Sequence, residues 1–452
     1  MRRTDMDDYR PRPGTLVEFE LTARGPAVPH GIPPSLIQQG HMRLAGENRA
    51  AGVRQSPWVA HAFNVPGRAD VTAMSAALRD FVAAHDSYRA WFEHGGEGGF
   101  TGWGYPADAI RVAPREAGEF TDSVALRDHL HASIDAGTIP HSWPVCVAGV
   151  ILRDEFSTFY LAIDHSLSDG FSMALLFAEM RARYDGHRTG TPVEFGATDE
   201  MLMITAREHK RVAELTTDSP EIVAWREFIE AGGGRLPSFP ADLGNPSGGL
   251  VPAKRLETEI FGEAGGARFR DHCRARDGGF AGGVFAALAH AQREADGTEL
   301  YRVLTAVTTR TKDRGLRTQG WLINLVPIMI DTRGDFDELI PKAHEAFKRA
   351  RTLAQIPLHA VIAMLASDGE SLSIPPMVSY VNGRGLPGAA DYTACDARLL
   401  PGPDNAADVS MWFNWMPDYV NVVTQLPDTP EASATAPPHL ARVVETIRAA
   451  GQ

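Results

Sequence analysis

The sequence predicts an α/β protein built of two lobes of related architecture. The chain has 452 residues, which is too long for one ordinary hydrophobic core and suggests two or three domains. Apolar residues make up 44% of it and charged residues 22%, the proportions of a soluble globular protein. Strand and helix patterns alternate on both sides of residues 232–252, which are dense in glycine and proline and form the clearest linker.

The N-terminal half carries the patterns of a helix, a hairpin and a second helix. Residues 1–35 are rich in proline and glycine, and we expect them to cover a surface rather than build a core. Apolar side chains at helical spacing predict a helix over 71–84. Residues 144–163 predict a hairpin with its turn at 153–155, and helical spacing returns over 171–183.

The C-terminal half shows a similar alternation. The chain is expected to be mostly helical up to about residue 232, with Ser219 and Pro220 as an N-cap and first-turn pair. Beyond the linker, the pattern predicts a helix over 283–295. Strand patterns follow this helix at 301–308, 323–331, 376–382, 408–415 and 419–426.

Charge and cysteine content argue against several functional classes. The net charge of −13 disfavours nucleic acid as a partner, because phosphate binding needs a basic face. Cys146, Cys273 and Cys395 lie far apart, so neither a disulfide framework nor a zinc site is expected. The N-terminus lacks the apolar run of a secretory signal, and the longest apolar stretch, 321–330, is far short of the ~20 residues that span a bilayer. We therefore expect a cytoplasmic protein without a transmembrane segment.

The most informative segment is Asp164-His165-Ser166-Leu167-Ser168-Asp169-Gly170. It follows a strand pattern at 158–163 and precedes a helical one. A histidine at a strand end can reach over a cleft, and the Asp-Gly pair begins a sharp turn into a helix, which suits one rigidly held general base. A capped helix start, with His165 satisfied by a backbone carbonyl, fits the bare pattern as well.

Two other kinds of site fit this segment less well. A metal site would need a third ligand in a similar setting, and none accompanies His165 and Asp169. A serine nucleophile would need an elbow such as G-x-S-x-G, which the sequence lacks, and Ser166 and Ser168 are wrongly placed for one.

With its H-x-x-x-D-G pattern, the chain resembles the superfamily of condensation domains and polyketide-associated acyltransferases, which shares its fold group with chloramphenicol acetyltransferase. Further segments match in order over nearly the whole chain. The first is 81–89 (FVAAHDSYR, similar to R-H-x-x-L-R), and the second is Trp225 with 234–240 (GRLPSFP). The third is 309–310 with 320–327 (TR and GWLINLVP, similar to G-R…G-x-F-x-N-T-L-P), and the last is 426–430 (LPDTP, similar to P-D-N-P).

Two departures from the family pattern bear on the chemistry. Asp164 stands where peptide-bond-forming condensation domains usually carry a second histidine, while polyketide-associated acyltransferases are more permissive there. The resemblance therefore favours ester over amide formation. The late D-F-G-W-G motif is also missing, and the nearest strand pattern, 410–414 (SMWFN), does not match it.

The resemblance implies a definite fold and division of the chain. It implies two chloramphenicol-acetyltransferase-like lobes, with mixed sheets flanked by helices, that form a V with an active-site tunnel between them. The N-terminal lobe would span 1–195 and carry the motif, a helical connection and linker would span 196–255, and the C-terminal lobe would span 256–452.

The resemblance also implies a role for each site residue. His165 would remove the proton of an acceptor hydroxyl as that hydroxyl attacks a thioester carbonyl. Asp169 would be structural, paired with Arg310. Gly170 would leave room for the pantetheine arm of the donor, or would be a plain helix-start glycine. Asn324 would support the tunnel from the second lobe, or would cap a strand.

The implied function is transfer of an acyl group from CoA or an acyl carrier protein to a hydroxyl of a lipid, sugar or polyketide-like acceptor. We expect no permanently bound cofactor, no metal and a monomer. A freestanding condensation enzyme of natural-product biosynthesis, acting on carrier-bound substrates, is one alternative, and a non-catalytic recruitment module of the same fold is another. The oxyanion-stabilising group is not assigned, and His41, His85 and His290 are expected to be structural or surface residues.

Overall fold

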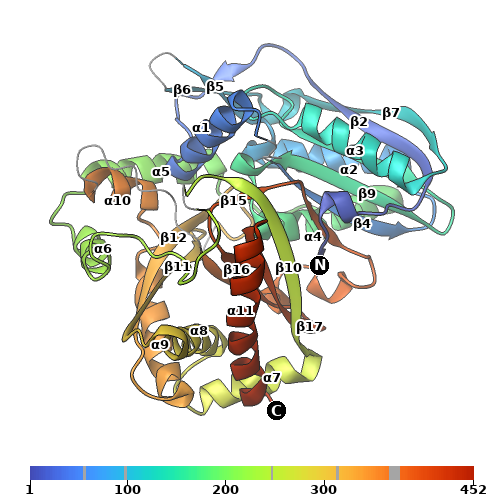
Figure 1. The fold of residues 1–452 in the computed structure, drawn as a ribbon. Coiled ribbons are helices and arrows are strands. Elements are labelled where there is room, and N and C mark those ends of the chain that lie inside the picture. The colour runs from blue at the N-terminus through green and yellow to red at the C-terminus, as the bar shows by residue number, and fades with distance from the viewer. Residues whose placement is uncertain (54–57, 96–98, 246–247, 312–314, 366–376) are drawn as a thin grey trace. The chain divides into compact units, whose positions relative to one another are not determined.

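The computed structural model describes residues 1–53, 58–95, 99–245, 248–311, 315–365 and 377–452 (Figure 1). The chain forms two compact units, each assembled from separate segments. Unit 1 comprises Met1–Lys210, Arg310–Leu322 and Leu386–Pro403, and unit 2 comprises Arg211–Thr309, Ile323–Gly385 and Asp404–Gln452.

Unit 1 is built on a seven-stranded mixed sheet with the strand order β1-β14-β4-β9-β8-β2-β7. Its strands are β1 (Arg2–Arg3), β14 (Arg398–Pro401), β4 (Trp58–Pro66), β9 (Phe156–Asp164), β8 (Cys146–Leu152), β2 (Gly14–Ala23) and β7 (Ile110–Phe120). A smaller sheet contains β3 (Val28–Pro29), β6 (Phe100–Gly104) and β5 (Ala90–His94). The helices are α1 (Leu36–Ala50), α2 (Val71–Ala84), α3 (Ser123–Gly137) and α4 (Gly170–Thr189), while α5 (Met201–Glu214) crosses the boundary between the units.

Alternating side chains of the central strands face helices on both sides of this sheet. Ala60 and Ala62 of β4 belong to the same buried cluster as Leu130 of α3. Phe63 points to the other face and packs edge-on against Phe177 of α4, with ring centroids 5.1 Å apart. A strand that is covered by helices on both faces is buried along its whole length and is therefore apolar at nearly every position, which explains the composition of β4 and β9.

Unit 2 combines a five-stranded sheet, a strand pair and several helices. The sheet has the order β13-β16-β17-β10-β15, and the pair is β11-β12. The strands are β10 (Val251–Gly262), β11 (Leu300–Thr308), β12 (Ile323–Asp331), β13 (Val378–Asn382), β15 (Asn405–Ala406), β16 (Ser410–Trp415) and β17 (Tyr419–Pro427). The helices are α6 (Pro220–Glu230), α7 (Glu263–Arg274), α8 (Phe280–Asp296), α9 (Phe336–Thr352), α10 (Leu358–Leu365) and α11 (Pro430–Ala450).

The helix α8 lies in the centre of the core of unit 2 and is buried on almost every side. Two consecutive glycines allow this packing. A Cβ on Gly283 would lie 2.3 Å from the sulfur of Cys273 in α7, and one on Gly282 would lie 3.1 Å from the Cα of His344 in α9. Larger residues at these positions would push the neighbouring helices away.

The α/β class is confirmed, as are most of the predicted elements. The helix over 71–84, the hairpin of β8 and β9, the helix α8 and the strands after it are present. Residue 376, at the start of one predicted strand, lies outside the described residues. Between α6 and β10, the described residues form neither helix nor strand, as the glycine and proline content predicts.

The prediction that residues 1–35 cover a surface was wrong for residues 14–23. Residues 14–23 form β2, an inner strand of the large sheet between β8 and β7. Leu16, Phe19 and Leu21 are buried there. The flanking prolines and glycines concealed this short apolar pattern.

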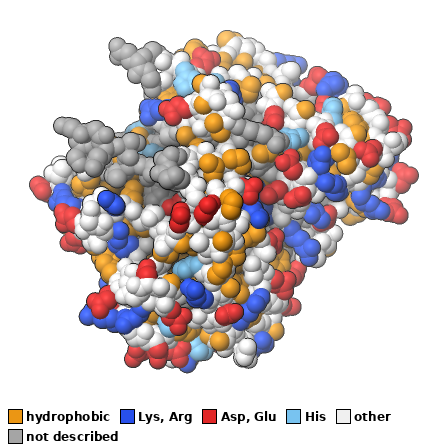
Figure 2. Space-filling view, in the orientation of Figure 1, with side chains coloured by type: hydrophobic (Ala, Val, Ile, Leu, Met, Phe, Trp, Pro, Cys, Tyr) orange, Lys and Arg blue, Asp and Glu red, His pale blue; other side chains and the backbone are white. Residues whose placement is uncertain are grey.

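Charged side chains of both signs lie on the face of the molecule shown in Figure 2. Acidic and basic side chains are intermixed over the described part of the face in view (Figure 2). Among the described residues, no helix combines the length and apolar character needed to cross a bilayer. The same residues contain no group of three or more histidine, cysteine or acidic side chains that could hold a metal ion.

Candidate active site

The strand β9 carries the motif into place. It lies between β4 and β8 and is buried from Ser157 to Asp164. A single 3-10 turn, His165–Leu167, follows it directly. The Asp164 carboxylate caps this turn, because it accepts hydrogen bonds from the Ser166 backbone N–H at 2.8 Å and from the Ser166 hydroxyl. Residue 164 therefore holds the turn that presents His165.

Burial raises the pKa of Asp164 to about 7, since its side chain is removed from water while its hydrogen bonds to Ser166 only partly compensate. The folded protein therefore holds a proton that the unfolded chain releases at lower pH. Between the ordinary carboxyl pKa and about 7, rising pH weakens the fold, because the unfolded chain binds fewer protons than the folded one.

We expect Asp164→Asn to remove this pH dependence. Each pKa unit corresponds to about 1.4 kcal/mol. The free energy of unfolding of the variant, taken relative to that of the wild type, should therefore be roughly 2–4 kcal/mol higher at about pH 8 than at about pH 5. Denaturant unfolding at the two pH values measures the difference. Asp154→Asn, at an exposed position in the turn between β8 and β9, is the control, and an equal pH response of both variants would contradict the prediction.

The Asp169 carboxylate is the centre of a buried network. It accepts from the Ser172 backbone N–H at 2.7 Å, which caps α4, and from the Leu322 N–H at 3.0 Å. Arg310 binds it through two hydrogen bonds of 2.8 and 3.1 Å. Burial alone would raise the pKa of Asp169, but the charge and hydrogen bonds of Arg310 outweigh it and lower the pKa below its ordinary value. The ion pair that the resemblance implied is thus present, and it joins the motif to residues 310–322.

Ser172 extends this network to Gly320. Its hydroxyl accepts from Arg310 at 2.8 Å and from the Gly320 N–H at 3.0 Å, and it donates to the Gly320 carbonyl at 2.9 Å. Arg310 also donates to the Thr318 carbonyl at 3.1 Å. The backbone on either side of Trp321 is therefore fixed by the same groups that begin α4.

Three aromatic rings meet at the motif. The ring of His165 lies 4.7 Å from that of Trp321 and 6.0 Å from that of His41, measured between centroids. The His41 and Trp321 rings are 5.2 Å apart and edge-on. His41 comes from α1, which is attached to the motif because Gln38 donates to the Ser166 carbonyl at 2.6 Å.

Sequence reasoning missed two of these rings. His41 was expected to be structural or on the surface, and Trp321 was given no role. A signal existed for each of them. Gln38 and His41 are three residues apart and therefore share one face of a helix. Trp321 lies in the segment that already matched the family pattern after Arg310.

The other two predicted site residues have different surroundings. A Cβ on Gly170 would meet nothing within 4 Å, so no neighbouring residue requires a glycine there. The Asn324 amide donates to the carbonyls of Ala354 and Ile356 and accepts from the N–H groups of Leu325 and Leu358. These four bonds use the whole hydrogen-bonding capacity of the amide, so in unit 2 Asn324 ties β12 to the start of α10.

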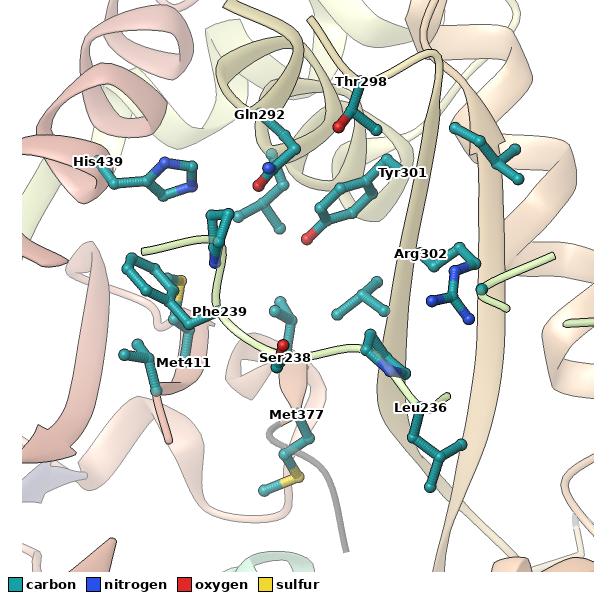
Figure 3. A pocket seen from close by; sticks show the side chains of 18 of the residues that line it. Leu236, Ser238, Phe239, Gln292, Thr298, Tyr301, Arg302, Met377, Met411 and His439 are labelled. Carbon is teal, nitrogen blue, oxygen red and sulfur yellow. The ribbon is translucent and has the colours of Figure 1, made fainter. Parts of the chain in front are cut away.

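Unit 2 contains a separate cavity of about 290 Å³ (Figure 3). It is lined by residues of the linker at 232–240, of β11 and of β16, among others, and leucine, valine and methionine side chains form much of its wall. Ser238, Gln292 and Tyr301 direct polar groups toward it (Figure 3). None of the motif residues lines this cavity, so it is distinct from the candidate active site.

Comparison with known proteins places the chain in a family. The model of the condensation domain matches residues 31–386. The 2'-acyl-2-O-sulfo-trehalose (hydroxy)phthioceranyltransferase PapA1 of Mycobacterium tuberculosis is 32% identical over 388 residues, which cover 83% of this chain and 73% of the relative. The trehalose-2-sulfate acyltransferase PapA2 of the same species is 30% identical over 463 residues, or 97% and 95% of the two chains.

Solved structures agree with this relationship. The PapA2 acyl transferase superimposes with a TM-score of 0.90 at 28% identity, over 100% of both chains. The first condensation domain of the calcium-dependent antibiotic synthetase superimposes with a TM-score of 0.67 at 16% identity, over 94% of this chain and 97% of that one, which shows a common fold. The expected chloramphenicol-acetyltransferase-like fold is confirmed. The chain belongs to the condensation-domain family, as a relative of the Pap-type acyltransferases.

Proposed function

We propose that this chain is an O-acyltransferase that moves an acyl group from a CoA or carrier-protein thioester to a sugar hydroxyl, with His165 as general base. The observation that carries the proposal is the position of His165, in a turn capped by Asp164 and beside a helix start tied to Arg310 by Asp169. The names of PapA1 and PapA2, which act on sulfated trehalose, support a sugar acceptor.

The proposed reaction requires the transfer of one proton, from the acceptor hydroxyl to the leaving thiolate. The His165 imidazole takes the proton of the acceptor hydroxyl while the oxygen attacks the thioester carbonyl carbon. The tetrahedral intermediate then loses the thiolate, and the imidazolium returns the proton to sulfur. Because no acyl-enzyme forms, no nucleophilic serine or cysteine is required. The products are an ester and a free thiol.

Rate enhancement would come from two sources. Holding donor and acceptor together converts a bimolecular encounter into a positioned one, which supplies up to roughly 7–11 kcal/mol of the barrier. General-base assistance adds about 10²–10⁴-fold. The position of His165 directly after a buried strand and in a capped turn would serve both effects, because it fixes the base before the substrates bind.

The proposal is tested by supplying the purified protein with acyl-CoAs of increasing chain length and with trehalose-2-sulfate, trehalose or a simple primary amine. We expect thiol release that depends on a sugar acceptor, and an ester product detected by mass spectrometry. If CoA esters fail, the same acyl groups are supplied on a phosphopantetheinylated carrier protein. An amide product alone would favour a condensation enzyme, and failure with both kinds of donor would favour a recruitment module.

Gly170 offers a test of where the donor passes. Since a Cβ there meets no protein atom within 4 Å, we expect Gly170→Ala to fold at least as stably as the wild type. If the pantetheine arm passes this backbone, the variant should raise KM for the donor, and Gly170→Val should raise it further, while KM for the acceptor stays unchanged. Gly46→Ala, at another open position in α1, is the control. Unchanged donor KM in both Gly170 variants would assign this glycine to the helix start alone.

A further inference from the structure

The indole N–H of Trp321 is a buried hydrogen-bond donor without a partner in the described part of the chain. An indole nitrogen can donate but cannot accept. Leaving such a donor unpaired in a buried position is unfavourable, because its hydrogen bond to water is lost without replacement. Trp103 also has a buried and unpaired indole N–H, so this property alone does not indicate a function.

The location of Trp321 distinguishes it. Its ring lies 4.7 Å from the ring of His165, with an angle of 53° between the planes. The ring of His41 packs edge-on against the indole at 5.2 Å. The ring that carries this unpaired donor thus packs against the imidazole that would act as the base.

The indole is also held from both sides through its backbone. The preceding residue, Gly320, exchanges hydrogen bonds with the Ser172 hydroxyl, and the following N–H, of Leu322, donates to Asp169. A Cβ on Gly320 would lie 2.8 Å from the side chain of Met201, so the backbone before Trp321 packs closely against that side chain. A donor fixed before the reaction loses no free energy in reorganising during it, which is what stabilisation of a developing charge requires.

We propose that the Trp321 indole N–H donates to the carbonyl oxygen of the thioester and stabilises the negative charge that this oxygen acquires in the tetrahedral intermediate. The inference rests on the proposed function. The new bond joins the acceptor oxygen to the carbonyl carbon, and the carbon–sulfur bond breaks. The transferred proton travels from the hydroxyl through His165 to the thiolate, and Trp321 keeps its own proton throughout.

Asp169 would also position Trp321 for this reaction. Asp169 holds α4 through Ser172 and holds the Trp321 segment through Leu322. One carboxylate therefore sets the distance between the turn with the base and the segment with the carbonyl donor. Asp169 is a positioning residue for Trp321, and Trp321 is the group that touches the substrate.

The substitution Trp321→Phe tests the inference, because phenylalanine keeps an aromatic ring beside His165 and removes the N–H. We expect kcat to fall by about 10²–10³-fold, the usual effect of losing one oxyanion donor, with KM for both substrates nearly unchanged. The pH dependence of kcat/KM should not move. Trp103→Phe is the matched control and should retain the wild-type rate. A shifted pH profile with unchanged kcat would instead show that the ring acts on the imidazolium, and it would overturn the inference.

A binding measurement separates this inference from the proposed function. The Trp321 N–H signal in a proton–nitrogen NMR spectrum is assigned by its loss in Trp321→Phe. A CoA ketone, with a methylene group in place of the thioester sulfur, should move this signal downfield, whereas an alkyl-CoA thioether without a carbonyl should not. The ketone should have the same effect on His165→Ala protein, which cannot turn over.

The combined outcomes decide both questions. Turnover that survives Trp321→Phe at the Trp103→Phe rate overturns the inference and leaves the proposed function standing. Failure of all turnover overturns the function, while a ketone-specific shift of the Trp321 signal would still support carbonyl binding. An unmoved signal with a bound ketone overturns the inference whatever the turnover.

Discussion

Replacing His165 by alanine is expected to remove acyl transfer and leave the fold intact. The loss should be about 10²–10⁴-fold in kcat, because the variant keeps the bound substrates in position but has no base for the hydroxyl proton. Stability should change little, because the turn is held by the hydrogen bond that the Ser166 N–H donates to Asp164 and by the one that Gln38 donates to the Ser166 carbonyl. Sugar-dependent thiol release measures the rate, and thermal unfolding monitors the fold.

His129→Ala is the control for this experiment. His129 lies in α3, and its Nε2 pairs with Glu18 at 3.1 Å, so its loss removes a partly exposed histidine and one contact of Glu18 from the same unit. We expect the control to keep the wild-type rate, because pairs of this kind contribute about 0–1 kcal/mol. A His165→Ala protein with wild-type turnover would refute the general-base assignment.

Asp169→Ala should damage the fold itself. The Arg310 guanidinium is fully buried, and without its partner it becomes an unpaired charge. Removing one partner of a buried ion pair typically costs about 3–5 kcal/mol. The Ser172 and Leu322 N–H groups lose their acceptor as well. We expect a much lower midpoint of denaturant unfolding, with loss of activity following from loss of structure.

A double variant separates charge burial from other effects. Asp169→Ala combined with Arg310→Met removes both charges, so its loss of stability should be smaller than the sum of the two single losses. Asp391→Ala is the control, because Asp391 pairs with Arg181 at 2.7 Å with both side chains partly exposed, and it should cost about 0–1 kcal/mol. An Asp169→Ala protein that is stable but inactive would contradict the expected role of this carboxylate in stabilising the fold.

Elements with a clear local period could be predicted from the sequence. The helix α2 follows from apolar residues at helical spacing behind an Asp70 cap, and the hairpin of β8 and β9 follows from two apolar runs around a polar turn. The strand β2 was not predicted because its local period is less clear. There the apolar alternation is short and is flanked by proline and glycine, so composition outweighed periodicity.

Some residues of the candidate site could be predicted from the sequence, and others were not. Local pattern and family resemblance together were enough to select His165, Asp169 and Arg310. The contacts with His41 and Trp321 were not predicted. Local periodicity does not reach residues more than one hundred positions away along the chain, and the family pattern marks the segment of Trp321 without indicating which rings it contacts. Periodicity describes neighbours within a helical turn or a strand. Contacts between distant residues, such as those of the His41 and Trp321 rings with His165, depend on how the elements pack.

The sequence by itself determined the motif, the strand that carries it, the helix that follows it and the family to which the chain belongs. The tertiary structure decided that residues 310–322 and 386–403 join unit 1, although their order along the chain suggests the second lobe. The first segment is held there by the buried charge pair of Arg310 with Asp169, and the second by the pairing of β14 with β4. A buried charge must be neutralised and an open strand edge must be paired, and both demands are met by whichever partner the packed chain brings near, irrespective of sequence distance.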